Sequence, residues 1–266
     1  MISDYHMHTS LCGHAEGDMR AYVEQALTAG ISEMGFADHL PLLLRWESGL
    51  SMTPDDIDDY VAAVQALARE YAPDLRIVLG IEADYFESVE ADLAATLAMY
   101  PFEYVIGSIH FLSDGFGFDQ GRHHDEYLRR GVDSVYLDYY RLVQKAAASG
   151  LFDVAAHLDL PKKFGDLPVD AEAVAAAADA ALRAVKAAGM AIEINTSGWR
   201  RPVGEAYPAP SLLTRAAELG IPLTFGSDAH RPTEVACDFA RALELARSAG
   251  YTQTLRLGDR TLVDLS

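Results

Sequence analysis

Short apolar runs alternate with longer stretches of helical periodicity along the chain. The apolar runs are rich in Ile, Val and Leu, which is typical of strands buried on both faces of a sheet. Several of them follow a glycine that ends the preceding helix in the left-handed conformation. The expected strands lie at 4–9, 31–38, 76–83, 103–109, 151–157, 190–196 and 221–228. The expected helices lie at 19–29, 54–71, 88–99, 134–149, 170–188, 210–219 and 232–249.

This alternation predicts a parallel sheet, because parallel strands need a crossover connection that is usually a helix. There are about seven such units, so we expect an α/β fold, a distorted (βα)7 barrel related to the (β/α)8 design. No linker-like stretch divides the chain, and we therefore expect one domain over residues 1–266. Residues 254–265 are expected to form a hairpin that turns at Gly258, and the loops 111–126 and 41–53 to cover the barrel mouth.

Histidine and carboxylate residues follow the apolar runs at corresponding places. In barrels of this type the active site lies at the carboxyl ends of the strands, and these residue types bind divalent zinc, manganese and iron. Residues i and i+2 of a strand point the same way, so His6 and His8 can present two groups to one pocket. The candidate ligands are His6, His8, His14, His39, Glu82, His110, His157, Asp228 and His230.

Each of these residues also has an interpretation without metal. A single histidine at a strand end is more often a hydrogen-bonded structural residue, but a full set of buried polar groups needs partners, which cations would supply. We interpret His123 and His124 as solvated residues of the 111–126 loop, and Asp38 as a cap or a partner of a ligand. Glu193 faces either the barrel interior or the helix layer, and the sequence leaves both open.

Composition limits the kinds of partner. The formal net charge is −19, whereas a surface that binds nucleic acid needs basic patches; a short strand held by metal ions stays open. No apolar run approaches the ~18 residues needed to span a bilayer, and the N-terminus does not resemble a signal peptide. The two cysteines, Cys12 and Cys237, do not make a disulfide framework, so we expect a cytoplasmic protein.

The motifs around these residues resemble those of a known family, the polymerase and histidinol phosphatase (PHP) superfamily. The chain contains, in the order of that family, HMHTSLCGHAEG, FADH, GIEADY, GSIHF, AHLDLPKKFG, EINTSGWRRP and GSDAH. Histidine at position 14 is typical of the branch of monofunctional histidinol-phosphate phosphatases. The resemblance implies a distorted (βα)7 barrel with three divalent ions, which could be zinc, iron or manganese.

The resemblance also assigns the ligands to the three ions. The first ion would be held by His6, His8, Glu82 and Asp228. Glu82 would bridge to a second ion held by His110 and His157. The third ion would be held by His14, His39 and His230.

An activity follows from the same resemblance. This branch of the family hydrolyses L-histidinol phosphate to L-histidinol and phosphate in histidine biosynthesis, and a hydroxide that bridges two ions would attack the phosphorus in line. Asp228 is the candidate that accepts the water proton and later protonates the leaving alkoxide. Lys162 and Arg200 match basic positions of the family and are candidate phosphate ligands. Asp159 and Asp38 are candidates to face the cationic end of the substrate.

Two other interpretations stay open. Another PHP hydrolase, acting on other small phosphomonoesters or on nucleotide ends, would use the same ligands. A nuclease should carry a long positive channel, which the net charge of −19 does not favour. A non-catalytic metal-binding module is the third interpretation, and the complete set of candidate ligands argues against it.

Overall fold

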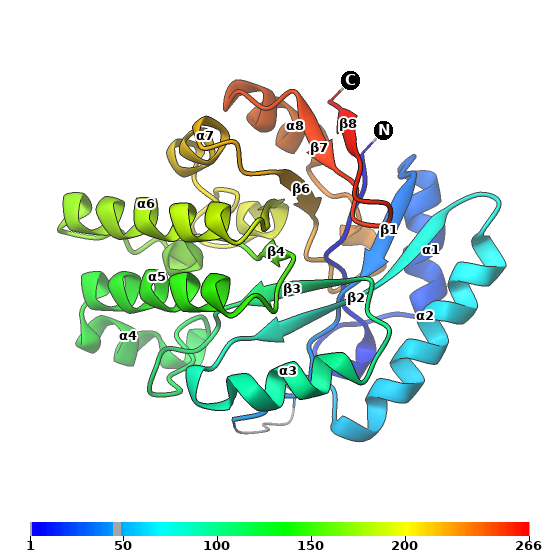
Figure 1. Ribbon diagram of the computed structural model, residues 1–266, viewed down its shortest axis with the longest axis horizontal. Coiled ribbons are helices and arrows are strands. Elements are labelled where there is room, and N and C mark those ends of the chain that lie inside the picture. The colour runs from blue at the N-terminus through cyan, green and yellow to red at the C-terminus, as the bar shows by residue number, and fades with distance from the viewer. Residues whose placement is uncertain (1, 45–48, 266) are drawn as a thin grey trace.

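Six parallel strands form one curled sheet in the order of the chain (Figure 1). The computed structural model describes residues 2–44 and 49–265. The strands are β1 (Glu33–Phe36), β2 (Arg76–Asp84), β3 (Tyr104–Ser108), β4 (Val154–Ala155), β5 (Ala191–Asn195) and β6 (Leu223–Gly226). Every neighbouring pair is parallel, as expected when helices connect successive strands.

The N-terminal segment closes this sheet between its two edge strands. On one side, the amide of Gly35 donates to the carbonyl of Asp4 at 2.9 Å. On the other side, the amide of Tyr5 donates to the carbonyl of Phe225 at 3.1 Å, and that of His8 to the carbonyl of Ala229 at 2.9 Å. The segment thus occupies the seventh strand position, and the predicted distorted (βα)7 barrel is confirmed.

Helices surround the barrel, and most lie within two or three residues of their predicted bounds. They are α1 (Met19–Thr28), α2 (Ile57–Tyr71), α3 (Glu90–Ala98), α4 (His124–Arg130), α5 (Val132–Ser149), α6 (Ala171–Ala187), α7 (Pro210–Glu218) and α8 (Phe239–Ser248). The prediction of a continuous helix over 232–249 is wrong, because the backbone at Ala236 and Asp238 is left-handed, with φ of 56° and 61°. The prediction that the loop extends to residue 126 is also wrong, since α4 begins at His124.

The barrel interior is apolar at its base and polar at its mouth. Val78, Tyr104, Ile106 and Ala191 belong to one buried apolar cluster at the base. Side chains two residues further along these strands share the same face, and Glu82, Ser108 and Glu193 extend this face toward the mouth. Tyr104 fills the space beside Gly80, where an added Cβ would lie 2.1 Å from the tyrosine ring.

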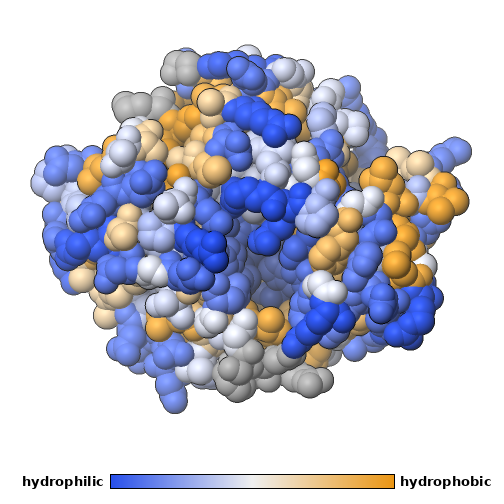
Figure 2. Space-filling view, turned by 180° about the vertical axis from the view of Figure 1, so that it is seen from behind, coloured by the Kyte–Doolittle hydropathy of each residue, from blue (hydrophilic) through white to orange (hydrophobic). Residues whose placement is uncertain are grey.

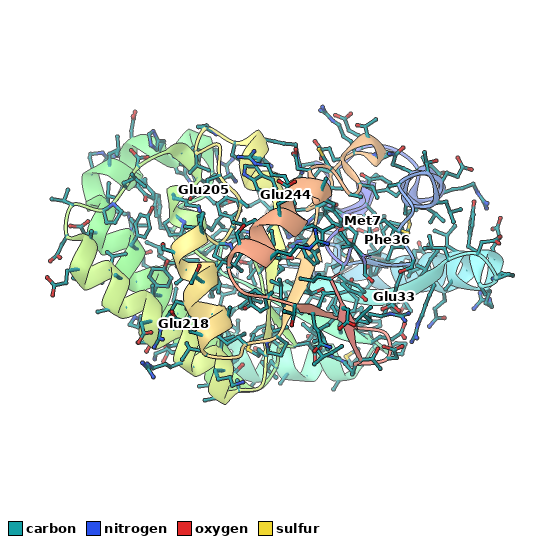
Figure 3. All side chains as sticks on the ribbon, turned by 90° about the horizontal axis from the view of Figure 1, so that it is seen from above. Met7, Glu33, Phe36, Glu205, Glu218 and Glu244 are labelled. Atoms are coloured by element: carbon teal, nitrogen blue, oxygen red, sulfur yellow. The ribbon has the colours of Figure 1, made fainter. Side chains whose placement is uncertain are left out.

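A C-terminal hairpin closes the opposite end of the barrel, as predicted. β7 (Gln253–Leu255) pairs antiparallel with β8 (Leu262–Asp264), and Leu257 in the turn belongs to the interior apolar cluster. Glu33 lies beside this hairpin, whereas Met7 and Phe36 lie in the core (Figure 3). The Glu33 carboxylate accepts from the Gly258 amide at 2.9 Å. Among the residues described, no helix is long and apolar enough to cross a membrane.

Candidate metal centre

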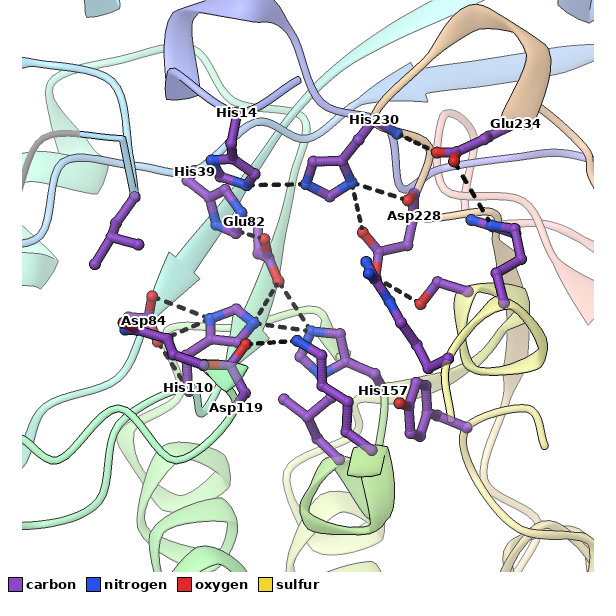
Figure 4. A pocket seen from close by; sticks show the side chains of 18 of the residues that line it. His14, His39, Glu82, Asp84, His110, Asp119, His157, Asp228, His230 and Glu234 are labelled. Carbon is purple, nitrogen blue, oxygen red and sulfur yellow. Dashed lines mark hydrogen bonds and ion pairs between the residues drawn. The ribbon is translucent and has the colours of Figure 1, made fainter. Parts of the chain in front are cut away.

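The predicted ligands line one cavity of about 550 Å³ at the carboxyl ends of the strands (Figure 4). The molecular surface in Figure 2 is hollowed near its centre, with hydrophilic side chains around the hollow. The cavity wall includes His14, His39, Glu82, His110, His157, Asp228 and His230. His6 and His8 are buried directly behind this wall, where they contact Glu82.

Glu82 lies at the centre of the cluster and is 1% exposed. It lies on β2 at the mouth of the barrel, where its backbone forms a parallel β-bridge with His39, just beyond the end of β1. One carboxylate oxygen lies 2.8 Å from Nδ1 of His39, and the other lies 3.2 Å from Nε2 of His157. Three further imidazoles lie within 4 Å of the same carboxylate, and they belong to His6, His8 and His110. This geometry suits a carboxylate that bridges two cations.

Asp228 organises a second group of donors on the other side of the cavity. Its Oδ1 lies 3.2 Å from Nε2 of His8 and 3.4 Å from Nδ1 of His230. The Nε2 atoms of His230 and His14 face each other at 3.0 Å. Those of His110 and His157 face each other at 3.2 Å. Two imidazole nitrogens that face each other at this distance need either a proton between them or a cation close to both.

Carboxylates outside the cluster fix several of these imidazole rings. Nδ1 lies 3.0 Å from Glu193 in His6, 3.4 Å from Asp38 in His8, and 3.1 Å from Asp84 in His110. Such contacts hold Nδ1 protonated and turn the Nε2 lone pair toward the cavity. Asp38 therefore lies behind a ligand, as one of its three predicted roles requires, and its full burial does not favour the predicted contact with the substrate. Glu193 faces the barrel interior.

The donor set fits divalent cations. Among residues 2–44 and 49–265, five groups of three donors each have their ligand atoms within 4.8 Å of one another, and they include His6–His8–Asp228 and Glu82–His110–His157. In the part of the chain that the structure describes, Nε2 of His6 and of His8 is buried without a hydrogen-bond partner. A buried polar atom without a partner is costly. Cations that accept imidazole and carboxylate ligands would satisfy these atoms.

The pKa values of the cluster residues determine which of them can bind a cation without first losing a proton. Burial, together with the neighbouring imidazoles of His39 and His8, lowers the pKa of His14 to about 4. Burial alone would raise the pKa of Glu82, but the imidazoles around it hold that pKa well below the ordinary value. Glu193 has its pKa lowered in the same way, mainly by His6. At neutral pH His14 is thus neutral and Glu82 is ionised, the forms that bind metal. Burial alone would lower the pKa of His8 and of His110, but the neighbouring carboxylates raise these pKa values to about 9 and about 10, so a cation that binds either imidazole has to displace a proton.

Comparison with known protein families identifies the family of this chain. The family model described as the PHP domain matches residues 4–197. The chain belongs to the PHP family. A relative from Deinococcus radiodurans, named "Probable histidinol-phosphatase", is 45% identical over 249 residues, which cover 94% of each chain.

Two crystal structures share the PHP fold of this protein. HisK from Listeria monocytogenes superimposes with a TM-score of 0.83 at 25% identity, over 90% of this chain and 99% of its own. Histidinol phosphate phosphatase from Lactococcus lactis superimposes with a TM-score of 0.79 at 21% identity, over 99% of each chain. That second protein was crystallised with zinc, L-histidinol and phosphate.

The two basic residues predicted to contact phosphate have different surroundings in this PHP domain. Arg200 lines the cavity, where its guanidinium donates to the Ser227 carbonyl at 2.8 Å. The ammonium of Lys162 is instead buried, 2.6 Å from Glu205 and 3.1 Å from Asp159. This placement does not favour the predicted role of Lys162 as a phosphate ligand.

Sequence reasoning missed several residues of the cavity wall, Lys163 and Asp119 among them, and misplaced Asp159. Lys163 lines the cavity and lies 3.0 Å from Asp119, which lines it too. Asp159 was expected to face the substrate, but its carboxylate forms an ion pair with Lys162 and accepts from the amide of Ala209 at 2.8 Å. Asp119 belongs to an irregular loop without periodicity, so no sequence signal singled it out.

The two predicted loops do reach the cavity. Asp119 and Gln120 come from the 111–126 loop, and Gly49 and Leu50 come from the 41–53 segment, of which residues 45–48 lie outside the described residues. His123 is hydrogen-bonded to the carbonyl of Gly117 at 3.0 Å. His124 contacts Asp166 at 2.6 Å. These two histidines are partly exposed and each has a hydrogen-bond partner, so the interpretation as solvated loop residues holds only in part, and neither is part of the metal cluster.

Proposed function

We propose that this PHP protein hydrolyses L-histidinol phosphate to L-histidinol and phosphate. The observation that carries the proposal is the convergence of the predicted imidazoles and carboxylates on one cavity. The Deinococcus radiodurans relative, which is 45% identical, is named "Probable histidinol-phosphatase". The Lactococcus lactis protein, similar over 99% of this chain, holds zinc together with both products of the reaction.

The proposed centre holds three divalent ions. Two separate donor groups, His6–His8–Asp228 and Glu82–His110–His157, support two of these ions, and a third group, His8–His39–His230, adds His39 and His230 but shares His8 with the first. His14, which faces His230 at 3.0 Å, adds a donor to the last group. When bound, such ions lower the pKa of a water ligand to roughly 7 and neutralise charge on the phosphoryl oxygens.

Residues of the chain would then move the proton and hold the substrate. We assign proton transfer to Asp228, because its Oδ2 is held by the Ser197 hydroxyl at 3.0 Å while its Oδ1 faces the imidazoles of the cluster. Of the cations on the cavity wall, which also include Arg201 and Arg231, we assign Arg200 and Lys163 to the phosphoryl oxygens. Asp119, also on the wall, is placed to attract the cationic end of the substrate.

Phosphate release, measured with metal content on the same sample, tests this function. The wild type should release phosphate from L-histidinol phosphate faster than from other phosphomonoesters or from nucleotide ends. Asp228→Asn should lose most of this activity, whereas Asp138→Asn, a change on the outer helix α5, should retain it. Full metal loading without any release would contradict the proposal, and release from nucleotide ends alone would favour a nuclease.

A further inference from the structure

Glu193 is a buried carboxylate that the proposed chemistry does not use. It is 1% exposed and lies on β5 with its side chain turned into the barrel. Both of its oxygens lie 3.0 Å from Nδ1 of His6, which is itself fully buried. A charge in such a place is costly unless it is paired and hydrogen-bonded, so its contacts indicate what it does.

Glu193 joins two predicted ligands that come from distant parts of the chain. Besides His6, it accepts the backbone amide of His157 at 2.9 Å. The Asn195 side chain donates to the same oxygen at 2.9 Å and also lies 3.2 Å from Asp228. One carboxylate thus sets the ring of His6 and the backbone of His157, and through Asn195 it reaches Asp228.

The backbone opposite Glu193 is shaped to permit this contact. Gly226, at the end of β6, lies against both partners of the pair. A Cβ added to Gly226 would lie 2.4 Å from the Glu193 carboxylate and 2.7 Å from Cβ of His6. Any larger residue would force the two side chains apart, so glycine is required here by close approach.

We propose that Glu193 is a positioning residue of the metal centre, which keeps His6 and His157 in ligating geometry. The proposal rests on the metal centre proposed above. The carboxylate keeps Nδ1 of His6 protonated, so that Nε2, which has no hydrogen-bond partner among the described residues, is presented to a cation. Asp84 contacts one predicted ligand, His110, and Asp38 contacts the ring of His8 and accepts from the amide of His39 at 2.8 Å. Glu193 likewise contacts two ligands, and through Asn195 it also reaches Asp228.

The test compares Glu193→Gln with Glu33→Gln. Glu33 is also a buried strand glutamate with several donors, but it lies at the opposite end of the barrel. Zinc affinity is measured by chelator competition, and the ligand field by the absorption spectrum of the cobalt-loaded protein. Glu193→Gln should weaken zinc binding roughly 10–100-fold and change the cobalt spectrum. At saturating zinc it should lower kcat more than it raises KM. Glu33→Gln should lower the unfolding temperature and retain both metal properties.

Further outcomes separate this inference from its premise. Wild-type zinc affinity and an unchanged cobalt spectrum in Glu193→Gln would overturn the positioning role, as would equal zinc loss in Glu33→Gln. Glu193→Asp retains the charge and should bind zinc more tightly than Glu193→Gln; equal weakening would assign the effect to packing and overturn the proposal. A wild type that binds no zinc, iron or manganese would overturn the proposed metal centre itself.

Discussion

Lys162 and Lys163 are adjacent in the chain but lie in different surroundings. Both belong to the 3₁₀ turn η5 (Leu160–Phe164), in which successive side chains diverge by about 120°. Lys162 turns into the protein, where it neutralises Asp159 and Glu205. Lys163 turns toward the cavity. Lys162 thus stabilises the fold, whereas Lys163, which pairs with Asp119, lies on the wall of the cavity that would receive a phosphorylated substrate.

Alanine substitutions should separate these two roles. Lys163→Ala should raise KM for L-histidinol phosphate by roughly 10–100-fold, because a charge-assisted hydrogen bond contributes about 1.5–3 kcal/mol. Lys162→Ala should lower the free energy of unfolding by about 3 kcal/mol, because it leaves Asp159 buried without its cation. Steady-state kinetics and urea unfolding of both variants check this. The assignment fails if Lys162→Ala raises KM and Lys163→Ala does not.

Sequence reasoning identified the residues whose position follows from strand geometry. The ligands at strand ends were predictable because residues at i and i+2 share a face. By the same rule Asp84 follows Glu82 on the face that points to the cavity, but the predicted strand ended one residue too early to include it. The choice between Lys162 and Lys163 was not predictable, since a short 3₁₀ turn has no periodicity by which to orient it.

Helix α2 shows how a local signal sets the start of an element. The helix predicted over 54–71 follows Thr53, and the turn η2 (Pro54–Asp56) leads directly into α2. The Asp56 carboxylate accepts from the amide of Thr53 at 2.8 Å and from its hydroxyl at 2.6 Å. These two donors lower the pKa of Asp56. A carboxylate at the first turn also interacts favourably with the helix dipole.

Removing this cap should cost stability in a pH-dependent way. Thr53→Ala should lower the free energy of unfolding by about 1 kcal/mol at neutral pH. Because the folded pKa of Asp56 is lowered, its contribution is present above the ordinary carboxyl pKa near 4 and is lost as the pH falls below it. The difference between variant and wild type should therefore shrink in acid. Urea unfolding across this range measures it, with Thr28→Ala as the control at the end of α1. An equal difference at all pH values would contradict this account.

The predicted and observed starts of α8 differ because of a contact with a residue that is distant in sequence. The amide of Ala236 donates to the buried carboxylate of Asp4, 232 residues earlier in the chain. That contact holds the backbone out of helical geometry, so α8 begins only at Phe239. Local periodicity carries no information about such a partner. The helices whose ends depend on their own caps, such as α2, were therefore predicted more closely than α8.

At the scale of the whole molecule, the barrel separates stability from chemistry. The base is closed by the C-terminal hairpin, where Leu257 is 1% exposed, and the candidate ligands lie at the other end. In barrels of this type, residues of the base contribute mainly to stability. The prediction of one domain over residues 1–266 stays a prediction, as does the cytoplasmic location.

Leu257→Ala should test this separation. The change should lower the free energy of unfolding by about 2–5 kcal/mol, since it opens a cavity in the barrel interior. KM and metal content should stay at wild-type values wherever the variant is folded. Leu262→Ala in the same hairpin is the matched control, because Leu262 is 56% exposed and its loss should cost within about 0.5 kcal/mol. A changed KM in Leu257→Ala would show that the base communicates with the mouth.

The way the N-terminal segment closes the barrel has a consequence for biogenesis. His6 and His8 are translated more than 200 residues before the strand that flanks them, β6, and before their partner Asp228. A nascent chain therefore holds an incomplete set of donors until Asp228 has been made. If the centre holds the proposed ions, their capture has to follow the placing of this segment beside β6.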